Sequence, residues 1–139
     1  MKVRELMHKG VEIGAPDTLV SKLAKTMREK DIGAIPVSNN GKLVGMVTDR
    51  DITVRAFANG KDLSQLTAHD VMTKGVVCCR DTAKVRDVVQ IMEEKKIRRV
   101  PVTDEKDQIV GMMSLGDISD AVPGKLTREV MKAVSAHHA

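Results

Sequence analysis

Two short stretches of the chain place a hydroxyl and an acid at the same spacing. They are Thr48-Asp49-Arg50-Asp51 and Ser114-Leu115-Gly116-Asp117, and both fit the pattern Ser/Thr-x-x-Asp. We expect each to lie where a strand passes into a helix. Unpaired N–H groups at a helix start attract an anion such as phosphate. The carboxylate could accept hydrogen bonds from both ribose hydroxyls, and the Thr or Ser could contact phosphate or sugar. Each stretch could therefore hold a sugar phosphate.

The same spacing also has a purely structural interpretation. A hydroxyl at the N-cap and an acid three residues later form a capping box, which needs no ligand. Gly45 and Gly111 precede the two stretches at the same offset. Because many residues could cap a helix, this recurrence favours a functional role, and capping stays open as the alternative.

The stretches recur because a long segment of the chain is repeated. Ile32-Gly33-Ala34-Ile35-Pro36-Val37 returns as Ile97-Arg98-Arg99-Val100-Pro101-Val102. Leu6-Met7 likewise returns as Val71-Met72, and Asp17-Thr18 returns as Asp81-Thr82. Two copies of one supersecondary unit usually pack together. A two-fold pair has two equivalent clefts where its halves meet, and we expect the function there.

The elements that would position these residues follow the order β-α-β-β-α in each repeat. We expect an α+β fold of two pseudo-two-fold related repeats packed through their sheets. Strands are expected at 11–15, 34–38, 43–48 and 76–80, with a turn at Asn39-Asn40-Gly41. Helices are expected to begin at the capping pairs Asp17-Thr18 and Asp81-Thr82, at Asp49 or Arg50, and at Leu115 or Gly116. The predicted domains are repeat 1 at 1–60, a linker at 61–67, repeat 2 at 68–122, and a C-terminal helix (126–135) and tail at 123–139.

Helical spacing of apolar residues predicts how the main helices pack. One apolar stripe contains Val20, Leu23, Ala24 and Met27, and the other contains Val85, Val88, Val89 and Met92. We therefore expect each helix to lie on a sheet.

Composition narrows the functional class. The chain has 139 residues, a net charge of +4, nine Met and one aromatic residue, Phe57. The lack of aromatic stacking platforms disfavours nucleic-acid binding. No apolar stretch approaches about 20 residues and no signal-peptide pattern opens the chain, so we expect a cytoplasmic protein that does not bind a membrane.

Arg98-Arg99 is the largest chemical difference between the copies, because it replaces Gly33-Ala34. The arginines are either solvated cations before an edge strand or phosphate contacts that reach across the seam between the repeats. The small Gly33-Ala34 pair would leave room for a flat base. Arg50 is a third candidate phosphate contact.

The sequence predicts binding rather than catalysis. It lacks a nucleophile elbow, a phosphate-cradling Gly-rich loop and a cluster of metal ligands. Cys78 and Cys79 are adjacent, so one would face inward and the other outward, and a redox or metal role is the alternative. His137-His138 lie in a polar tail that we expect to be disordered.

Taken together, these motifs resemble the CBS domain, and the chain resembles a tandem CBS pair, or Bateman module. The matched patterns are h-x-x-h-P-V, at Ile32–Val37 and Ile97–Val102, and G-h-h-Ser/Thr-x-x-D, at Gly45–Asp51 and Gly111–Asp117. The resemblance covers about residues 3–122 and is similar to small stand-alone bacterial CBS-pair proteins, including the hypoxic-response type.

The resemblance implies binding of an adenosine-containing ligand (AMP, ADP, ATP, NAD(H) or S-adenosylmethionine) between the repeats, with no required cofactor, and a homodimer. Asp51 and Asp117 match ribose-binding positions, Thr48 and Ser114 the neighbouring hydroxyl, and Ile32, Gly33 and Ala34 the base slot. Arg98 and Arg99 match phosphate positions, and as bulky residues they predict that one cleft holds a base better. The candidate ligand-binding residues are Asp51, Asp117, Thr48, Ser114, Ile32, Gly33, Ala34, Pro36, Thr73, Val76, Arg98, Arg99 and Arg50.

Two functions follow as hypotheses. The first is a non-catalytic regulatory pair that binds an adenine nucleotide and passes the signal to an unknown effector protein or through its dimer. The alternative is a ligand-free, stress-associated interaction scaffold in which Ser/Thr-x-x-Asp only caps helices.

Overall fold

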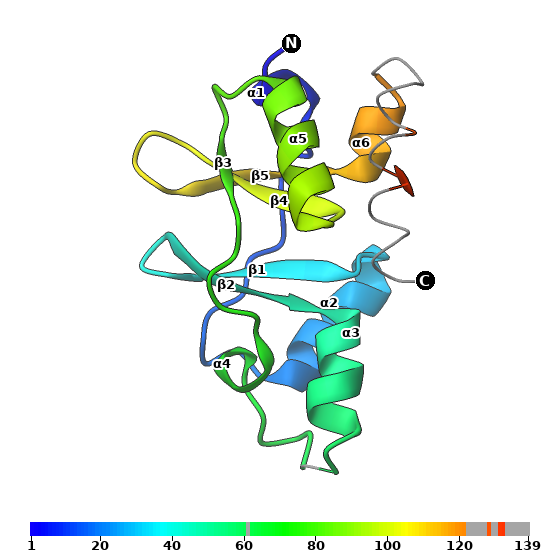
Figure 1. Cartoon of the computed structure of the whole chain (residues 1–139). Coiled ribbons are helices and arrows are strands. Elements are labelled where there is room, and N and C mark those ends of the chain that lie inside the picture. The colour runs from blue at the N-terminus through cyan, green and yellow to red at the C-terminus, as the bar shows by residue number, and fades with distance from the viewer. Residues whose placement is uncertain (61, 122–127, 129–130, 133–139) are drawn as a thin grey trace. The chain divides into compact units, whose positions relative to one another are not determined.

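The chain forms two compact units, described in a computed structural model for residues 1–60, 62–121, 128 and 131–132. Unit 1 is Met1–Val11 together with Val77–Ala139, and unit 2 is Glu12–Val76. We call the segment at the start of each sequence repeat, residues 3–8 and 68–73, its lead-in. Each lead-in belongs to the unit that holds the sheet of the other repeat. Both units combine short helices with a small sheet, which confirms the α+β class (Figure 1).

Unit 2 is built on one β-hairpin. Strands β1 (Ala34–Asn39) and β2 (Lys42–Thr48) pair antiparallel, and the turn uses positive φ at Asn40 and Gly41, as predicted. The helical elements of unit 2 are α2 (Val20–Lys30), α3 (Asp49–Asp51), the π-helix η1 (Ile52–Phe57) and α4 (Ala68–Val71). The side chains buried between these elements include Val20, Leu23, Ile35, Val37 and Val47.

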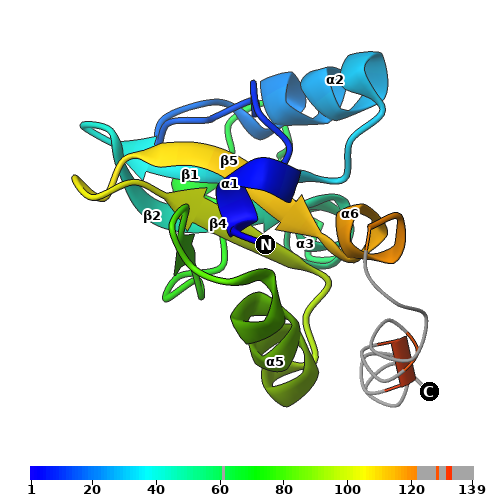
Figure 2. The same cartoon turned by 90° about the horizontal axis from the view of Figure 1, so that it is seen from above.

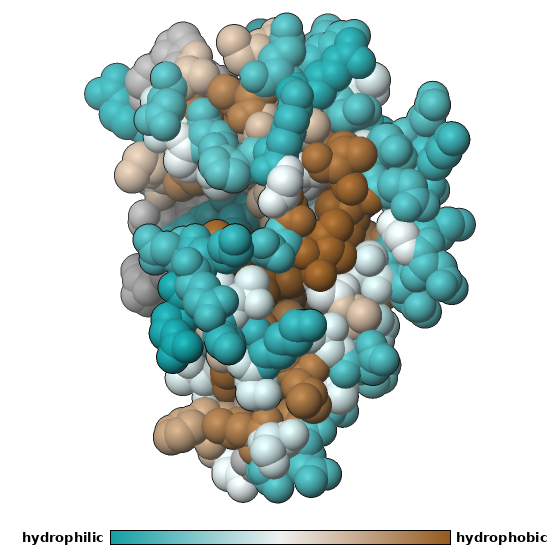
Figure 3. All heavy atoms as spheres, turned by 180° about the vertical axis from the view of Figure 1, so that it is seen from behind, coloured by the Kyte–Doolittle hydropathy of each residue, from teal (hydrophilic) through white to brown (hydrophobic). Residues whose placement is uncertain are grey.

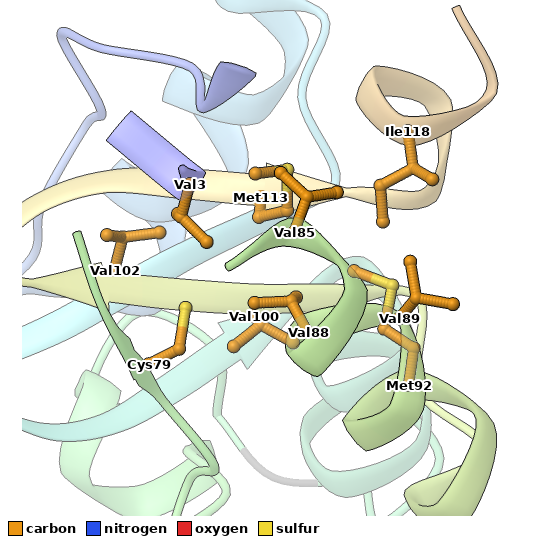
Figure 4. Packing of buried hydrophobic residues seen from close by; sticks show 10 residues of the cluster. All are labelled: Val3, Cys79, Val85, Val88, Val89, Met92, Val100, Val102, Met113 and Ile118. Carbon is orange, nitrogen blue, oxygen red and sulfur yellow. The ribbon is translucent and has the colours of Figure 1, made fainter. Parts of the chain in front are cut away.

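Unit 1 is built on three strands, with β3 (Cys79–Arg80) parallel to β4 (Arg99–Thr103) and β4 antiparallel to β5 (Ile109–Ser114). Its helices are α1 (Val3–Leu6), α5 (Val85–Lys95) and α6 (Leu115–Ser119). In two views α5 lies beside β4 (Figures 1 and 2). Figure 4 shows the buried cluster of unit 1, to which α1, β3, α5, both hairpin strands and α6 contribute.

Both apolar stripes face these cores, with one exception. Val85, Val88, Val89 and Met92 are all buried, as are Val20, Leu23 and Met27. Ala24 is exposed. The predicted packing of each helix by one apolar face is therefore confirmed.

Two local predictions were wrong, and a third was confirmed only in part. Residues 11–15 form a single bridge, Gly14 to Val37, because Pro16 lacks an N–H that could extend the pairing, and in 76–80 only Cys79–Arg80 is a strand. The helices α2 and α5 begin at Val20 and Val85 rather than at the Asp-Thr pairs. Thr18 instead accepts a bond from the Ala15 N–H, and distant carbonyls of Leu66 and Met1 accept from Val20 N–H and Val85 N–H.

The helix starts at Asp49 and Leu115 are confirmed. Most of the predicted helix at 126–135, and the tail with His137-His138, lie outside the described residues; Arg128, Met131 and Lys132 are helical. Among the helices that the structure describes, none is long and apolar enough to cross a membrane.

Candidate functional site

Both Ser/Thr-x-x-Asp stretches form complete capping boxes. The Thr48 Oγ1 accepts from the Asp51 N–H at 3.1 Å, and the Asp51 Oδ2 accepts from the Thr48 N–H at 2.9 Å. Ser114 and Asp117 repeat these contacts at 3.2 and 2.9 Å, and the Ser114 hydroxyl also bonds the Asp117 Oδ2. The structural interpretation of the motif is thus realised, and it occupies one carboxylate oxygen of each acid.

The second oxygen of each acid has a different neighbour in each unit. In unit 2 the Asp51 Oδ1 lies 3.9 Å from the Arg55 Nε. In unit 1 the Asp117 Oδ1 lies 3.5 Å from the His8 Nδ1. The two carboxylates are only 13% and 18% exposed, so a ligand that reaches Oδ1 would meet a partly desolvated acceptor.

The start of each hairpin lies directly beside its capping box. The Gly33 carbonyl accepts from the Asp49 N–H at 3.0 Å, and the Arg98 carbonyl accepts from the Leu115 N–H at 2.8 Å. Across the hairpins, Ala34 pairs with Thr48 and Arg99 pairs with Ser114. The predicted base-slot and phosphate positions are therefore next to a predicted ribose acid in both units.

A lead-in segment completes each group. Thr73 and Met46 exchange backbone hydrogen bonds at 2.8 and 3.0 Å in unit 2, and His8 and Met112 do so at the same distances in unit 1. This close approach of the two backbones explains why glycine, at Gly45 and Gly111, precedes each Ser/Thr-x-x-Asp stretch. A Cβ at Gly45 would lie 2.9 Å from the Thr73 carbonyl oxygen, and one at Gly111 would lie 2.8 Å from that of His8.

The structure divides the predicted site residues between the units. Unit 2 brings Gly33, Ala34 and Thr73 to the box of Thr48 and Asp51, and unit 1 brings Arg98 and Arg99 to the box of Ser114 and Asp117. Four other candidates take no part in the contacts described above. Ile32 packs against the core of unit 2. Pro36 is buried inside β1, Arg50 is exposed, and Val76 is half-buried at the end of unit 2.

Sequence reasoning missed two residues, Arg55 and His8. The Arg55 Nη1 donates to the Val71 and Met72 carbonyls at 3.1 and 3.0 Å, so it ties η1 to the end of α4. Its signal was the i,i+4 spacing from Asp51. The signal for His8 was its position in the first lead-in, which corresponds to that of Thr73 in the second.

The other reactive groups lie elsewhere. Cys79 is buried and Cys78 exposed, as the alternation predicted, and both are free thiols. Burial, with smaller contributions from Cys78 and Asp81, raises the pKa of the Cys79 thiol to about 11, so it stays protonated at neutral pH. Within the described part of the chain, no three His, Cys, Asp or Glu residues are grouped so that they could hold a metal ion.

A hollow of about 690 Å³ opens in unit 1 at a different place. Its lining is Arg4, Arg80, Asp81, Thr82, Asp104, Glu105 and Lys106. None of these was predicted to bind a ligand, and Arg80 is paired with Asp107 at 2.8 Å.

Comparisons with known proteins identify the family of the chain. The family model of the CBS domain matches residues 3–56 and 68–124. Hypoxic response protein 1 of Mycobacterium tuberculosis is 35% identical over 133 residues, which cover 94% of this chain and 92% of that protein. The CBS domain-containing protein YhcV of Bacillus subtilis is 35% identical over 117 residues, which cover 84% of this chain and 82% of YhcV.

Two solved structures are similar as well. The crystal structure of Hypoxic Response Protein I with two coordinated zinc ions has a TM-score of 0.80 at 33% identity, covering 88% of this chain and 100% of that one. The structure of CBSX2 in complex with AMP has a TM-score of 0.76 at 27% identity, covering 86% of this chain and 94% of that one.

Proposed function

The chain belongs to the CBS domain family and carries the domain twice, and on this basis we propose that it is a non-catalytic regulatory protein that binds an adenosine-containing ligand. The observation that carries the proposal is the second carboxylate oxygen of Asp51 and Asp117, which the capping box does not use and which faces a basic side chain in each unit. Each is a partly buried acceptor beside a hydroxyl, a hairpin start and a lead-in segment. The AMP complex of CBSX2, a structural relative, supports the choice of ligand.

In unit 2 we propose that the Asp51 Oδ1 accepts a ribose hydroxyl. Capping leaves this oxygen available, and Thr48 lies at the same helix start, where it could contact sugar or phosphate. Gly33 and Ala34 carry little or no side chain, so a flat base could approach the backbone there. Ile32, which packs against the core of unit 2, would give that base an apolar wall.

In unit 1 we propose that Asp117 has the same role toward ribose. We also propose that the residues beside Asp117 contact the phosphate of the ligand and not its base. Arg98 and Arg99 are exposed where unit 2 has Gly33 and Ala34. Arginine forms charge-assisted, often bidentate bonds to phosphate, so these residues would contact phosphate rather than a base. The adenine nucleotide would then be a ligand of the site residues in both units, and it would not be a required cofactor.

The signal would pass through a second copy of the chain or through an effector protein. Supporting this, η1 exposes Phe57 at 70% and Val54 at 47%. Figure 3 shows hydrophobic side chains reaching the surface between hydrophilic ones on one face of the molecule. Exposed apolar residues grouped on one element favour a protein contact.

A thermal-shift screen tests the proposal. AMP, ADP, ATP, NAD⁺ and S-adenosylmethionine are added to the full chain, with GMP and GTP for comparison. A ligand that binds only the folded state raises Tm by mass action. We expect at least one adenosine ligand to raise Tm, and Asp51→Ala to remove much of that rise.

The matched control is Asp70→Ala. Asp70 closes a capping box on α4 in the same unit, where its Oδ2 accepts from the Thr67 N–H at 2.8 Å. Both substitutions should lower the Tm without ligand, since losing a cap costs about 1 kcal/mol. Only Asp51→Ala should reduce the ligand-induced rise.

The alternative is a ligand-free interaction scaffold, and the complete capping boxes are the observation that favours it. It predicts no rise in Tm with any adenosine ligand at millimolar concentration. It also predicts that Asp51→Ala and Asp70→Ala behave alike throughout. That result would remove the ligand-binding proposal.

A further inference from the structure

Asp51 and Asp117, the acids that we propose to bind ribose, differ in the residue that faces the oxygen not used for capping. The Asp117 Oδ2 is held by the Ser114 N–H and hydroxyl, and the Asp117 Oδ1 faces the His8 Nδ1 at 3.5 Å. The Asp51 Oδ1 faces Arg55, which keeps its charge at every physiological pH. Histidine changes charge close to neutral pH, so only the neighbour of Asp117 can be switched by a proton.

The position of His8 is set by its backbone. Its N–H donates to the Met112 carbonyl at 2.8 Å, and its carbonyl accepts from the Met112 N–H at 3.0 Å. The segment lies so close to β5 that a Cβ at Gly111 would lie 2.8 Å from the His8 carbonyl oxygen. The imidazole itself is 79% exposed, so it exchanges protons with solvent and can move aside for a ligand.

The corresponding residue of unit 2 provides an internal comparison. Thr73 makes the same pair of backbone hydrogen bonds to Met46 on β2. Its side chain does not titrate. The two groups therefore share a backbone arrangement and a capping box, and differ at this position in the capacity to bind a proton.

Several other charged groups lie on the elements that neighbour His8. They are Asp117 on α6, Lys9 in the same segment, and Arg98 and Arg99 before and at the start of β4. Glu5 on α1 is already engaged by the Lys2 N–H at 2.6 Å. Of these groups, Asp117 makes the ion pair with His8.

We propose that protonation of His8 opposes ligand binding at Asp117, so that the ribose site of unit 1 depends on pH and the site of unit 2 does not. This inference rests on the proposed function. An imidazolium that donates from Nδ1 competes with a ribose hydroxyl for the Asp117 Oδ1. Arg55 competes in the same way for the Asp51 Oδ1, at 3.9 Å, but its charge and therefore its effect do not change with pH. Neutral His8 leaves that acceptor to the sugar, and binding at Asp117 is therefore stronger above the titration range of histidine than below it.

The experiment is a site-resolved NMR titration of the full chain with adenosine at pH 5.5 and pH 8.0. Adenosine carries no phosphate, so its charge stays constant over this range. The Gly116 amide reports the site of unit 1 and the Asp49 amide that of unit 2. If protonated His8 competes with the sugar, the apparent Kd at Gly116 should be higher at pH 5.5 than at pH 8.0, whereas the apparent Kd at Asp49 should be the same at both.

Two reciprocal variants exchange the residues at this position. His8→Thr should bind adenosine at the Gly116 site with the same Kd at both pH values. Thr73→His should add a pH dependence at the Asp49 site. As a second measurement in the unsubstituted protein, saturating adenosine should lower the midpoint pH at which the His8 ring protons titrate.

The outcomes separate this inference from the proposed function. If adenosine binds and His8→Thr keeps the full weakening at pH 5.5, or the His8 midpoint does not move, the inference is wrong and ligand binding stands. If neither amide shows a saturable shift at either pH, adenosine does not bind, and the ribose sites and the inference fail together.

Discussion

Asp51 and Asp117 illustrate how one side chain can serve structure and binding at once. In each acid the Oδ2 caps a helix start, and the Oδ1 faces a basic side chain of the same unit, Arg55 or His8. The capping and ribose interpretations are therefore compatible, because they use different oxygens. For the same reason, replacing either acid changes stability and binding together, and a comparison with Asp70, a capping acid outside the proposed site, separates the two effects.

The glycines of the motif have a structural reason that can be tested at single residues. A Cβ at Gly111 would lie 2.6 Å from the Met7 Sδ and 2.8 Å from the backbone oxygen of His8, which cannot rotate away. We expect Gly111→Ala to lower the free energy of unfolding by about 1–3 kcal/mol, as overpacking does. Urea denaturation measures the change.

Gly116→Ala is the matched control, since it lies in the same unit, five residues away. A Cβ there would meet only the Ser114 Oγ, at 3.6 Å, which is ordinary van der Waals contact. Because Gly116 lies within α6, Ala should stabilise by about 0.5–1 kcal/mol. Equal stabilities of the two variants would contradict the close approach of the lead-in.

At the scale of elements, the side chain of Arg55 links η1 to α4. Arg55 supplies a donor to the Val71 and Met72 carbonyls, at the end of α4. Those carbonyls belong to the helix terminus, where intrahelical partners are missing. The Thr73 N–H, next along the chain, donates to Met46 on β2. Arg55 therefore positions the segment that lies beside the Asp51 group.

We expect Arg55→Ala to release that segment. Losing the partner of a part-buried acceptor costs about 1–3 kcal/mol, and the loss should be local. Hydrogen exchange of the Met72 and Thr73 amides should become faster, while the Val37 and Val47 amides in the hairpin stay protected. Arg50→Ala, at an exposed position of the preceding turn, is the control and should leave all four unchanged. Unchanged Thr73 exchange in Arg55→Ala would contradict this role.

At the scale of the whole molecule, the lead-ins are exchanged between the two repeats. Val3 is fully buried in the core of unit 1, and its N–H donates to the Ala83 carbonyl at 2.8 Å. The Val85 N–H at the start of α5 donates to the Met1 carbonyl. The beginning of the chain therefore completes a unit whose other residues come from the second half.

Deleting residues 1–11 tests this exchange. We expect the unit 1 amides of Val100 and Met113 to lose hydrogen-exchange protection, because the deletion opens a core position and removes the backbone bonds to β5 and α5. The unit 2 amides of Val37 and Val47 serve as the internal control and should remain protected. The reverse pattern, with unit 2 losing protection and unit 1 keeping it, would mean that the lead-in serves its own repeat.

Many features of this protein could be predicted from its amino-acid sequence. The repeat, the hairpin turn at Asn40-Gly41, the buried stripes of α2 and α5, the helix starts at Asp49 and Leu115, and the CBS family all follow from patterns a few residues long. Such patterns are readable because backbone geometry relates residues two to four positions apart. The predicted starts of α2 and α5 were wrong because local patterns do not include distant partners. Carbonyls far away in the chain satisfy the first N–H groups in place of the local Asp-Thr pairs.

The tertiary structure alone decided which lead-in joins which sheet, and therefore that His8 meets Asp117 and that Arg55 meets Val71 and Met72. His8 and Asp117 are more than a hundred positions apart in the chain. No local periodicity relates residues at that separation. Their meeting depends on which assembly of segments buries Val3, Met113 and Ile118 together, and that is a property of the packed core.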